Sequence, residues 1–352
     1  MSTRFESKNL SALLNILPEP EFEFTILNYN IQCDRRNSPG GPFHASHKNW
    51  TIEFRLPAIM KFIKFHNPTV VNLFEISADI CNDVMIGLRE LGYNVVTGAY
   101  AANNSGAFHY VTGVAKTCII NKSHMFWFTS TPFDPLSDDT RSSDTVLVEN
   151  KEAFEKGSLI VDITTPDKAH VLISVNHWPL RFDYQMQCSK MLTNYLAEQI
   201  HQDPDIKIVC GGDFNTFPSF EGKCIKNLID AGFTHHVDPN TKISFIAWPF
   251  DLGLVDPAIV RDAIDKIKDM SPLEARKWLV TRVIELHGSP LCSLLDHVFT
   301  YGFNPESSMK LLVPDGLDLN NLTPAFIESA LNDAPIGGSL SDHFATLTTL
   351  YW

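Results

Sequence analysis

The chain has 352 residues, of which 44% are hydrophobic, so it can bury a large core as one big domain or two ordinary ones. Its 28 lysines and arginines stand against 41 aspartates and glutamates, a net charge of −13. This balance disfavours tight, sequence-independent binding of long nucleic acid, which needs a basic surface. The sequence contains no internal repeat, and no apolar run approaches the roughly 20 residues of a membrane span.

The first twenty residues are expected to form a loose lead-in segment, 1–20. The segment begins MSTRFESKNL, which is polar and lacks the apolar core of a signal peptide. The seven cysteines are scattered, without a CxxC spacing, as is typical of reduced and buried thiols. We therefore expect a soluble protein with a cytoplasmic location.

The first predicted strand covers 21–31, EFEFTILNYNI, and its alternation places Asn30 on the same face as Phe24. Asn30 is thus an amide at the end of a buried strand, although an asparagine that closes a turn would give the same pattern. A polar loop with Arg35 and Arg36 follows. Loops at such strand ends commonly carry substrate contacts.

An amphipathic helix over 50–65 leads to a second buried strand over 69–75, TVVNLFE. This strand ends in Glu75, and a carboxylate at the rim of a core is costly unless it is paired or bound to a metal ion. Another helix follows from Ser77, the expected N-cap, to Gly92. The pattern is strand, helix, strand, helix.

The next part of the chain is β-rich, with strands predicted over 111–121 and 158–163 and a long loop between them. The strand over 171–177, VLISVNH, alternates and ends in His177. A histidine here is also compatible with a purely structural, hydrogen-bonded role. A helix over 184–200 then leads into the most distinctive stretch of the sequence.

That stretch reads IVCGGDFNTFP over 208–218 and follows a buried strand over 206–210. Two glycines let the backbone bend and let a ligand approach closely. Asp213 and Asn215 then occupy alternate positions, which places an acceptor and a donor on one side of an extended segment. Gly-Asp at a strand end is also ordinary turn chemistry. The functional interpretation of this motif therefore depends on the polar residues at the other strand ends.

A short helix is predicted over 220–231. The adjacent His235 and His236 are expected to be loop residues rather than a metal pair, because neighbours on an extended segment point to opposite faces. Two charged helices are predicted within an insertion at about 251–290. We expect this insertion to be a substrate lid, with a contact surface for a protein partner as the alternative.

The strand over 293–300, SLLDHVFT, is interrupted by Asp296, and a carboxylate in mid-strand needs a partner. The segment over 305–338 is expected to be irregular, with one short helix. Asp342 and His343 then precede the closing strand, FATLTTLYW.

Polar residues thus recur at the ends of six segments, and two packed sheets would bring them to one rim: Asn30, Glu75, His177, Asp213, Asn215, Asp296, Asp342 and His343. The chain has no nucleophile elbow and no glycine-rich nucleotide loop. Carboxylates and amides suit Mg²⁺ or Mn²⁺, and histidines suit proton transfer and contact with an anionic oxygen. Together these residues predict metal-assisted attack of water on phosphorus.

Six segments in order, LNYN, NLFE, VNHW, GGDFN, LLDH and SDH, resemble the signature of the endonuclease/exonuclease/phosphatase superfamily, which has the deoxyribonuclease I-like fold. GGDFN and SDH are the specific motifs. NLFE and VNHW depart from the usual pattern, in which a glutamine precedes the glutamate and a threonine the histidine. The resemblance implies an α+β four-layer sandwich of two packed mixed β-sheets flanked by helices, as one domain over 21–352.

The resemblance also implies a metal site and its nearest neighbours. Glu75 would be the principal ligand of Mg²⁺ or Mn²⁺, with Asn30 and Asp342 completing or bordering the site. Asp213 would orient or deprotonate the attacking water. Asn215 would hold the phosphate and its developing charge.

Three further residues would surround the phosphate. His343, paired with Asp296, would contact the phosphate oxygens. His177 would be a phosphate contact or a proton donor to the leaving group.

The function expected is therefore a Mg²⁺-dependent phosphoesterase, with phosphodiesters favoured over phosphomonoesters. The substrate would be a short nucleic acid, a small phosphodiester or a lipid head group. Inositol-polyphosphate 5-phosphatases of this superfamily usually show a tryptophan before the Gly-Asp motif, where this chain has Cys210. The alternatives are a phosphomonoesterase of a small or lipid phosphate and a catalytically silent binding module, which the complete set of catalytic positions opposes. The sequence identifies no protein partner.

Overall fold

The computed structural model describes residues 23–33, 52–103, 106–129, 132–133, 156–179, 182–215, 223–237, 245–246, 266, 270, 292–293, 295–312 and 345–352. Several sequence expectations lie outside these residues. They are the lead-in segment, the loop with Arg35 and Arg36, nearly all of the insertion at 251–290, and both Asp342 and His343.

The first six-stranded sheet has the order β13-β14-β1-β2-β4-β3. Its strands are β1 (Phe24–Cys33), β2 (Val70–Ser77), β3 (Tyr93–Asn103), β4 (Gly106–Ala115), β13 (Ser308–Leu312) and β14 (Ala345–Leu350). The helices α2 (Ile52–His66) and α3 (Ala78–Glu90) belong to this half of the molecule. Because α2 carries the chain back over the sheet, β2 pairs with β1 in parallel, whereas the other strand pairs are antiparallel.

The second six-stranded sheet has the order β5-β6-β7-β8-β12-β9. Its strands are β5 (Ile119–Trp127), β6 (Gly157–Thr164), β7 (His170–His177), β8 (Lys207–Asp213), β9 (Thr234–His236) and β12 (Asp296–Tyr301). The helix α5 (Phe182–Gln202) connects β7 to its parallel partner β8, and α6 (Lys223–Asp230) follows. A separate short pair consists of β10 (Phe245–Ile246) and β11 (Cys292–Ser293).

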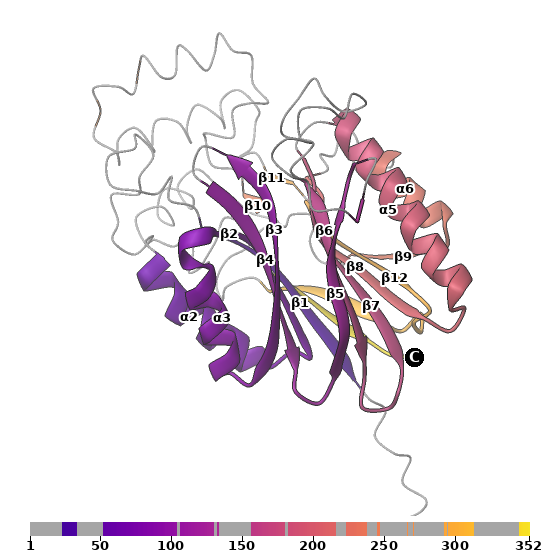
Figure 1. The fold of residues 1–352 in the computed structure, drawn as a ribbon, viewed down its shortest axis with the longest axis horizontal. Helices are drawn as coiled ribbons and strands as arrows, with labels where there is room; N and C mark the ends of the chain where they lie inside the picture. Colours follow the sequence, from indigo (N-terminus) through magenta and orange to yellow (C-terminus); the bar gives the residue numbers. More distant parts are fainter. Residues whose placement is uncertain are drawn as a thin grey trace, which may run out of the picture.

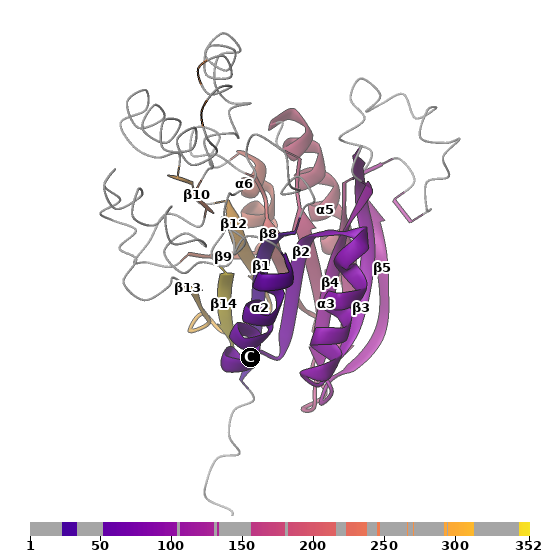
Figure 2. The same ribbon diagram turned by 90° about the vertical axis from the view of Figure 1, so that its left-hand side faces the viewer.

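The elements form four layers, in the order α2 and α3, first sheet, second sheet, α5 and α6 (Figure 1). Figure 2 shows the same layers face-on, with α2 and α3 toward the viewer and α5 and α6 behind the sheets. The alternation of the strands explains this arrangement, because Val209 packs between the sheets while its neighbours Ile208 and Cys210 pack under α5 and α6. In the same way Ile26 faces the other sheet and Leu27 faces α2 and α3. The expected four-layer α+β sandwich is confirmed.

One predicted strand is wrong in its boundaries. The structure splits the stretch over 111–121 into the end of β4 at Ala115 and the beginning of β5 at Ile119. The turn between them is closed by a hydrogen bond from the Cys118 amide to the Ala115 carbonyl at 2.9 Å. Cys118 is buried within the turn, so the apolar pattern continues across it and conceals the break.

Two edge strands were not predicted. His235 and His236 do not lie in a loop but in β9, which pairs with β12. β13 lies in the stretch over 305–338 that the sequence suggested to be irregular, and it pairs with β14. Both strands are short and lie at sheet edges, where a neighbouring strand rather than the local sequence supplies the hydrogen bonds.

Two expectations from composition can be compared with the described residues. The cysteines whose side chains are described are all buried and outside disulfide bonds: Cys81, Cys118, Cys188, Cys210 and Cys224. This agrees with the expectation of reduced, buried thiols. None of the helices in the described ranges has the length and apolar character needed to cross a membrane.

Candidate active site

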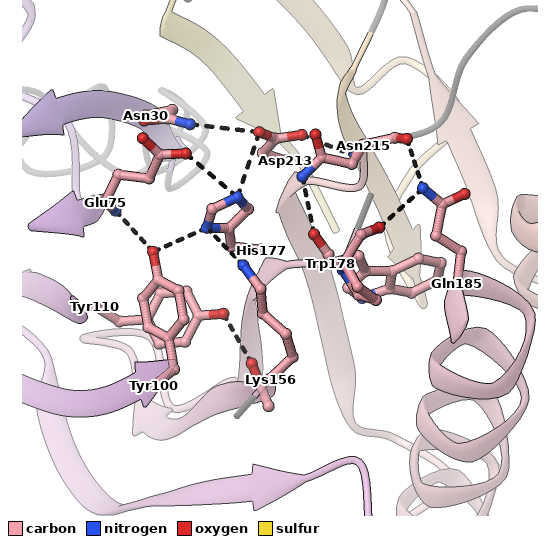
Figure 3. A network of polar contacts seen from close by, with 12 residues as sticks. Asn30, Glu75, Tyr100, Tyr110, Lys156, His177, Trp178, Gln185, Asp213 and Asn215 are labelled. Atoms are coloured by element: carbon pink, nitrogen blue, oxygen red, sulfur yellow. Dashed lines mark hydrogen bonds and ion pairs between the residues drawn. The ribbon is translucent and has the colours of Figure 1, made fainter. Parts of the chain in front are cut away.

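The candidate site lies at the carboxyl ends of two parallel strand pairs, one from each sheet. Asn30 and Glu75 come from β1 and β2 of the first sheet. His177 and Asp213 are the last residues of β7 and β8 in the second sheet and are directly paired in register. Figure 3 shows the four side chains pointing toward one another across the two sheets.

Glu75 has an unusual main-chain conformation. Its φ is 59°, in the left-handed region that costs about 1–3 kcal/mol for a residue other than glycine. The register of β2 against β4 shifts between Leu73 and Ile76, which is the kind of bulge that turns a side chain out of the regular alternation. The Glu75 amide donates to the Tyr100 hydroxyl at 2.9 Å. The left-handed conformation therefore costs free energy, and it places the Glu75 carboxylate at the rim of the two sheets.

Asp213 is almost completely buried, with 1% of its surface exposed. Its Oδ1 accepts the main-chain amide of Asn215 at 2.8 Å, and its Oδ2 accepts from Asn30 Nδ2 at 3.3 Å. Asn215 itself has a φ of 49° and donates from Nδ2 to the Trp178 carbonyl at 2.8 Å. Gln185 of α5 donates to the Asn215 carbonyl at 2.6 Å. These bonds fix the Asp213–Asn215 turn from both ends.

The two glycines before Asp213 are needed for different reasons. Gly212 has a φ of 137°, and a Cβ there would collide with the main-chain carbonyl of Asn176. Gly211 faces the first sheet, where a Cβ would lie 2.9 Å from Nδ2 of Asn28. Asn28 cannot easily move, since it accepts from Asn72 at 2.9 Å and donates to Thr346 at 3.3 Å. The absence of a side chain at Gly211 thus lets the sheets approach closely beneath the site.

His177 lies between the carboxylates of both sheets. Its Nε2 is 3.3 Å from Glu75 Oε1 and 3.8 Å from Asp213 Oδ2. Its Nδ1 is 2.9 Å from the Tyr100 hydroxyl and 3.4 Å from Lys156 Nζ. The imidazole therefore bridges the two halves of the site.

The donor atoms of Glu75, His177 and Asp213 all lie within 4.8 Å of one another, and the amide of Asn30 adjoins them. Two carboxylates held this close repel each other unless positive charge lies near them. Carboxylate and amide oxygens are the ligands that hard divalent cations prefer. The residues present therefore fit Mg²⁺ or Mn²⁺.

Asp296 also reaches this rim, but not from mid-strand as the sequence suggested. It is the first residue of β12, because the structure begins the strand later than the predicted 293–300. Asp296 pairs in register with Asp213 and is buried, with 2% of its surface exposed. The pairing of Asp296 with His343 stays a prediction, since His343 lies outside the described residues.

Sequence reasoning did not find four residues that support the site. Tyr100 contacts both Glu75 and His177, and Lys156 contacts His177. The buried Arg55 of α2 donates to the carbonyl of Ile31, next to Asn30, and Gln185 holds the turn at Asn215. A tyrosine at an alternate position of a strand resembles a core residue, and Lys156 follows a long loop without a pattern, so neither gave a signal.

Similarity to known proteins is found in structure but not in sequence. No protein-family model and no curated protein matches the sequence. Among solved structures, TDP2 from Caenorhabditis elegans is 13% identical, with a TM-score of 0.55 over 94% of this chain and 98% of that one. An endonuclease/exonuclease/phosphatase family protein from Bacteroides thetaiotaomicron is 13% identical, with a TM-score of 0.57 over 94% and 98%.

A mannosyl-6-phosphatase from Bacteroides thetaiotaomicron is also similar. It is 14% identical, with a TM-score of 0.57 over 94% of this chain and 100% of that one. Identities this low establish a shared fold rather than a shared activity. The chain has the fold of the endonuclease/exonuclease/phosphatase proteins, as its six ordered motifs predict.

Proposed function

We propose that the protein is a divalent-metal-dependent hydrolase of phosphoester bonds that prefers phosphodiesters to phosphomonoesters. The observation that carries this proposal is the convergence of Glu75, His177 and Asp213 from two sheets, with donor atoms within 4.8 Å. His177 and Asp213 are buried and Glu75 is partly exposed, and a cluster of this kind on strained main chain is typical of functional sites. The shared fold with a mannosyl-6-phosphatase supports the same reaction class.

Glu75 and Asn30 would hold the Mg²⁺ or Mn²⁺ ion, with Asp342 as the proposed third residue. When bound, the ion supplies positive charge that offsets the negative charge of the phosphate in the transition state. The low exposure of Asn30 and Asp213 keeps competing water away and strengthens electrostatic interactions.

Asp213 is proposed to accept the proton of the attacking water. Its Oδ1 is held by the Asn215 amide, which fixes the plane of the carboxylate. Asn215 Nδ2 donates one hydrogen to the Trp178 carbonyl, and we assign its second hydrogen to a phosphate oxygen. That donor would stabilise charge that develops as water attacks.

His177 is proposed to donate from Nε2, toward a phosphate oxygen or the leaving group. The pair Asp296 and His343 would contact the other phosphate oxygens. These roles follow the motif positions and agree with the locations of His177 and Asp296 at the rim.

Short nucleic acids, small phosphodiesters and lipid head groups are the proposed substrates, since a net charge of −13 disfavours long nucleic acid. A phosphomonoesterase is the second candidate, because one similar structure is a mannosyl-6-phosphatase. A catalytically silent binding module is disfavoured by the assembled cluster of Glu75, His177 and Asp213.

The test is hydrolysis of a substrate panel with Mg²⁺, Mn²⁺ or EDTA. The panel contains bis-(p-nitrophenyl) phosphate, p-nitrophenyl phosphate, short single-stranded RNA and DNA, sphingomyelin and inositol phosphates. We expect metal-dependent turnover of a diester that an Asp213→Asn variant lacks. Preferred hydrolysis of a monoester would select the second candidate. Folded, Mn²⁺-binding protein without turnover on any member would contradict the proposal in favour of the binding module.

A further inference from the structure

One hydroxyl group contacts both the metal-binding and the histidine side of the site. Tyr100 is buried in β3, with 1% of its surface exposed, and its ring stacks on Tyr110 with centroids 4.1 Å apart. The Tyr100 hydroxyl lies 2.9 Å from the Glu75 amide nitrogen and 2.9 Å from His177 Nδ1. Figure 3 shows the hydroxyl between these two residues.

The direction of each hydrogen bond can be assigned from chemistry. The Glu75 amide can only donate, so the Tyr100 oxygen accepts it. Among the described residues, His177 Nδ1 is the atom that can accept the hydroxyl's own hydrogen, so we direct that hydrogen to Nδ1. A tyrosine hydroxyl has an ordinary pKa of about 10, so it keeps its hydrogen at neutral pH. Lys156 Nζ, which is 3.4 Å from the same Nδ1, can also only donate.

Two donors directed at Nδ1 make this nitrogen a hydrogen-bond acceptor. The ring hydrogen is then on Nε2, which faces Glu75 Oε1 at 3.3 Å and Asp213 Oδ2 at 3.8 Å. Both of these atoms are acceptors. With the opposite tautomer, the Nε2 lone pair would face two carboxylates, and Nδ1–H would face two donors.

We propose that Tyr100 is a positioning residue whose hydroxyl fixes His177 in the Nε2–H tautomer and holds the Glu75 main chain in its left-handed conformation. The inference rests on the proposed function and specifies how His177 takes part in it. His177 enters the site as a hydrogen-bond donor to a phosphate oxygen, and the divalent ion is left to the oxygen ligands. A single hydroxyl thereby couples the geometry of Glu75 to the proton position on His177.

The first readout is the tautomer of His177 in metal-free protein, from ¹⁵N chemical shifts of the imidazole nitrogens, with the signal assigned by its loss in His177→Gln. Wild-type protein should show hydrogen on Nε2. Tyr100→Phe, which keeps the stacked ring, should show a mixture of the two tautomers. The matched control is Tyr93→Phe, another buried tyrosine of β3, whose hydroxyl donates to the Pro68 carbonyl at 2.8 Å.

The second readout is Mn²⁺ affinity, by titration calorimetry. In Tyr100→Phe both Mn²⁺ affinity and kcat should fall about 10- to 100-fold, the usual range for residues that orient metal ligands. KM should change less, because Tyr100 is buried behind the residues that would contact substrate. Tyr93→Phe should match wild type in both measurements.

Wild-type protein with hydrogen on Nδ1 would overturn the inference, and this spectrum is decisive even if the variant does not fold. A Tyr100→Phe protein that keeps both the Nε2–H tautomer and the wild-type Mn²⁺ affinity would also overturn it. Protein that shows the expected spectra and Mn²⁺ affinities but hydrolyses no phosphoester would support the positioning role of Tyr100 while contradicting the proposed function.

Discussion

Strand β7 begins and ends with a histidine that lies between two carboxylates, yet the two histidines differ in chemistry. At the first residue, His170 places Nε2 2.9 Å from Asp162 and Nδ1 2.7 Å from Asp203. At the last residue, His177 directs only Nε2 toward carboxylates, because Tyr100 lies against Nδ1. The His170 side chain is 37% exposed and that of His177 only 10%.

The partner of the second ring nitrogen decides what such a histidine does. Burial lowers the pKa of His170, but the hydrogen bond to Asp203 and the charge of Asp162 outweigh this, so the net shift is upward. With acceptors on both nitrogens, His170 links β7 to β6 and to the segment after α5, and the two carboxylates favour its protonated form. With a hydroxyl donor on Nδ1, His177 is a directed donor within a cluster that can take a cation.

The largest expected difference between the two ends is in turnover. Asp213→Asn removes the proposed proton acceptor and should lower kcat by about 10²- to 10⁴-fold. Asp162→Asn makes the same change at the other end and should leave kcat within about twofold, because the contacts described for the two sites have no residue in common. Steady-state kinetics on the preferred panel substrate would compare them. Similar losses in both variants would mean that Asp213 acts only through stability.

The next effect concerns metal binding. Mn²⁺ at about 100 times its Kd should raise the free energy of unfolding by about 2.7 kcal/mol, which EDTA should reverse. Glu75→Gln should lose this stabilisation, whereas Asp203→Asn should keep it. Thermal unfolding with and without Mn²⁺ would show the difference. If Asp203→Asn abolished the Mn²⁺ response, the ion would bind at the His170 end instead.

In metal-free protein, the free energy of unfolding should depend more on Asp162 than on Asp213. Asp162 accepts from Asn121 at 2.8 Å as well as from His170, so Asp162→Asn should lower the free energy of unfolding by about 1–3 kcal/mol. Asp213→Asn should be neutral or stabilising, since it removes a negative charge beside Glu75. Urea unfolding at constant m-value would measure both changes. A larger loss in Asp213→Asn would reverse the assignment of the two ends.

The smallest effect is a pH dependence at His170. Its pKa is raised above the ordinary value of 6.5, so the stabilisation is fully present below pH 6.5 and is lost as the pH rises through the higher folded value. The stability advantage of wild type over His170→Gln should therefore shrink from pH 6 to alkaline pH. Urea unfolding across this range is the measurement. An advantage that grows with pH would show that His170 is neutral in the folded protein.

The site residues at the strand ends could be predicted from sequence, but the residues that hold them in place could not. Alternation placed Asn30, Glu75, His177 and Asp213 at the ends of buried strands, because period two and a polar terminus are local signals. Their convergence depends on which strands pair and how the sheets pack. The pattern predicted the convergence only on the assumption of two packed sheets, and the resemblance in motif order supplied that assumption.

The supports depend on contacts between segments that are distant in sequence. Tyr100 looks like any core aromatic until its hydroxyl is seen beside Glu75 and His177. Strand β9 exists because β12 pairs with it, a contact that no local pattern contains. The turn at Cys118 was concealed by the burial of that residue.

The close approach at Gly211 has a consequence for how the protein reaches its native state. Asn30 and Glu75 form with one sheet and His177 and Asp213 with the other, so an intermediate with either sheet alone lacks part of the catalytic cluster. The complete cluster would arise only when the sheets dock through Gly211 and Asn28. Recovery of turnover during refolding would then time that docking, and a methyl group at position 211 would delay this recovery more than the formation of the strands.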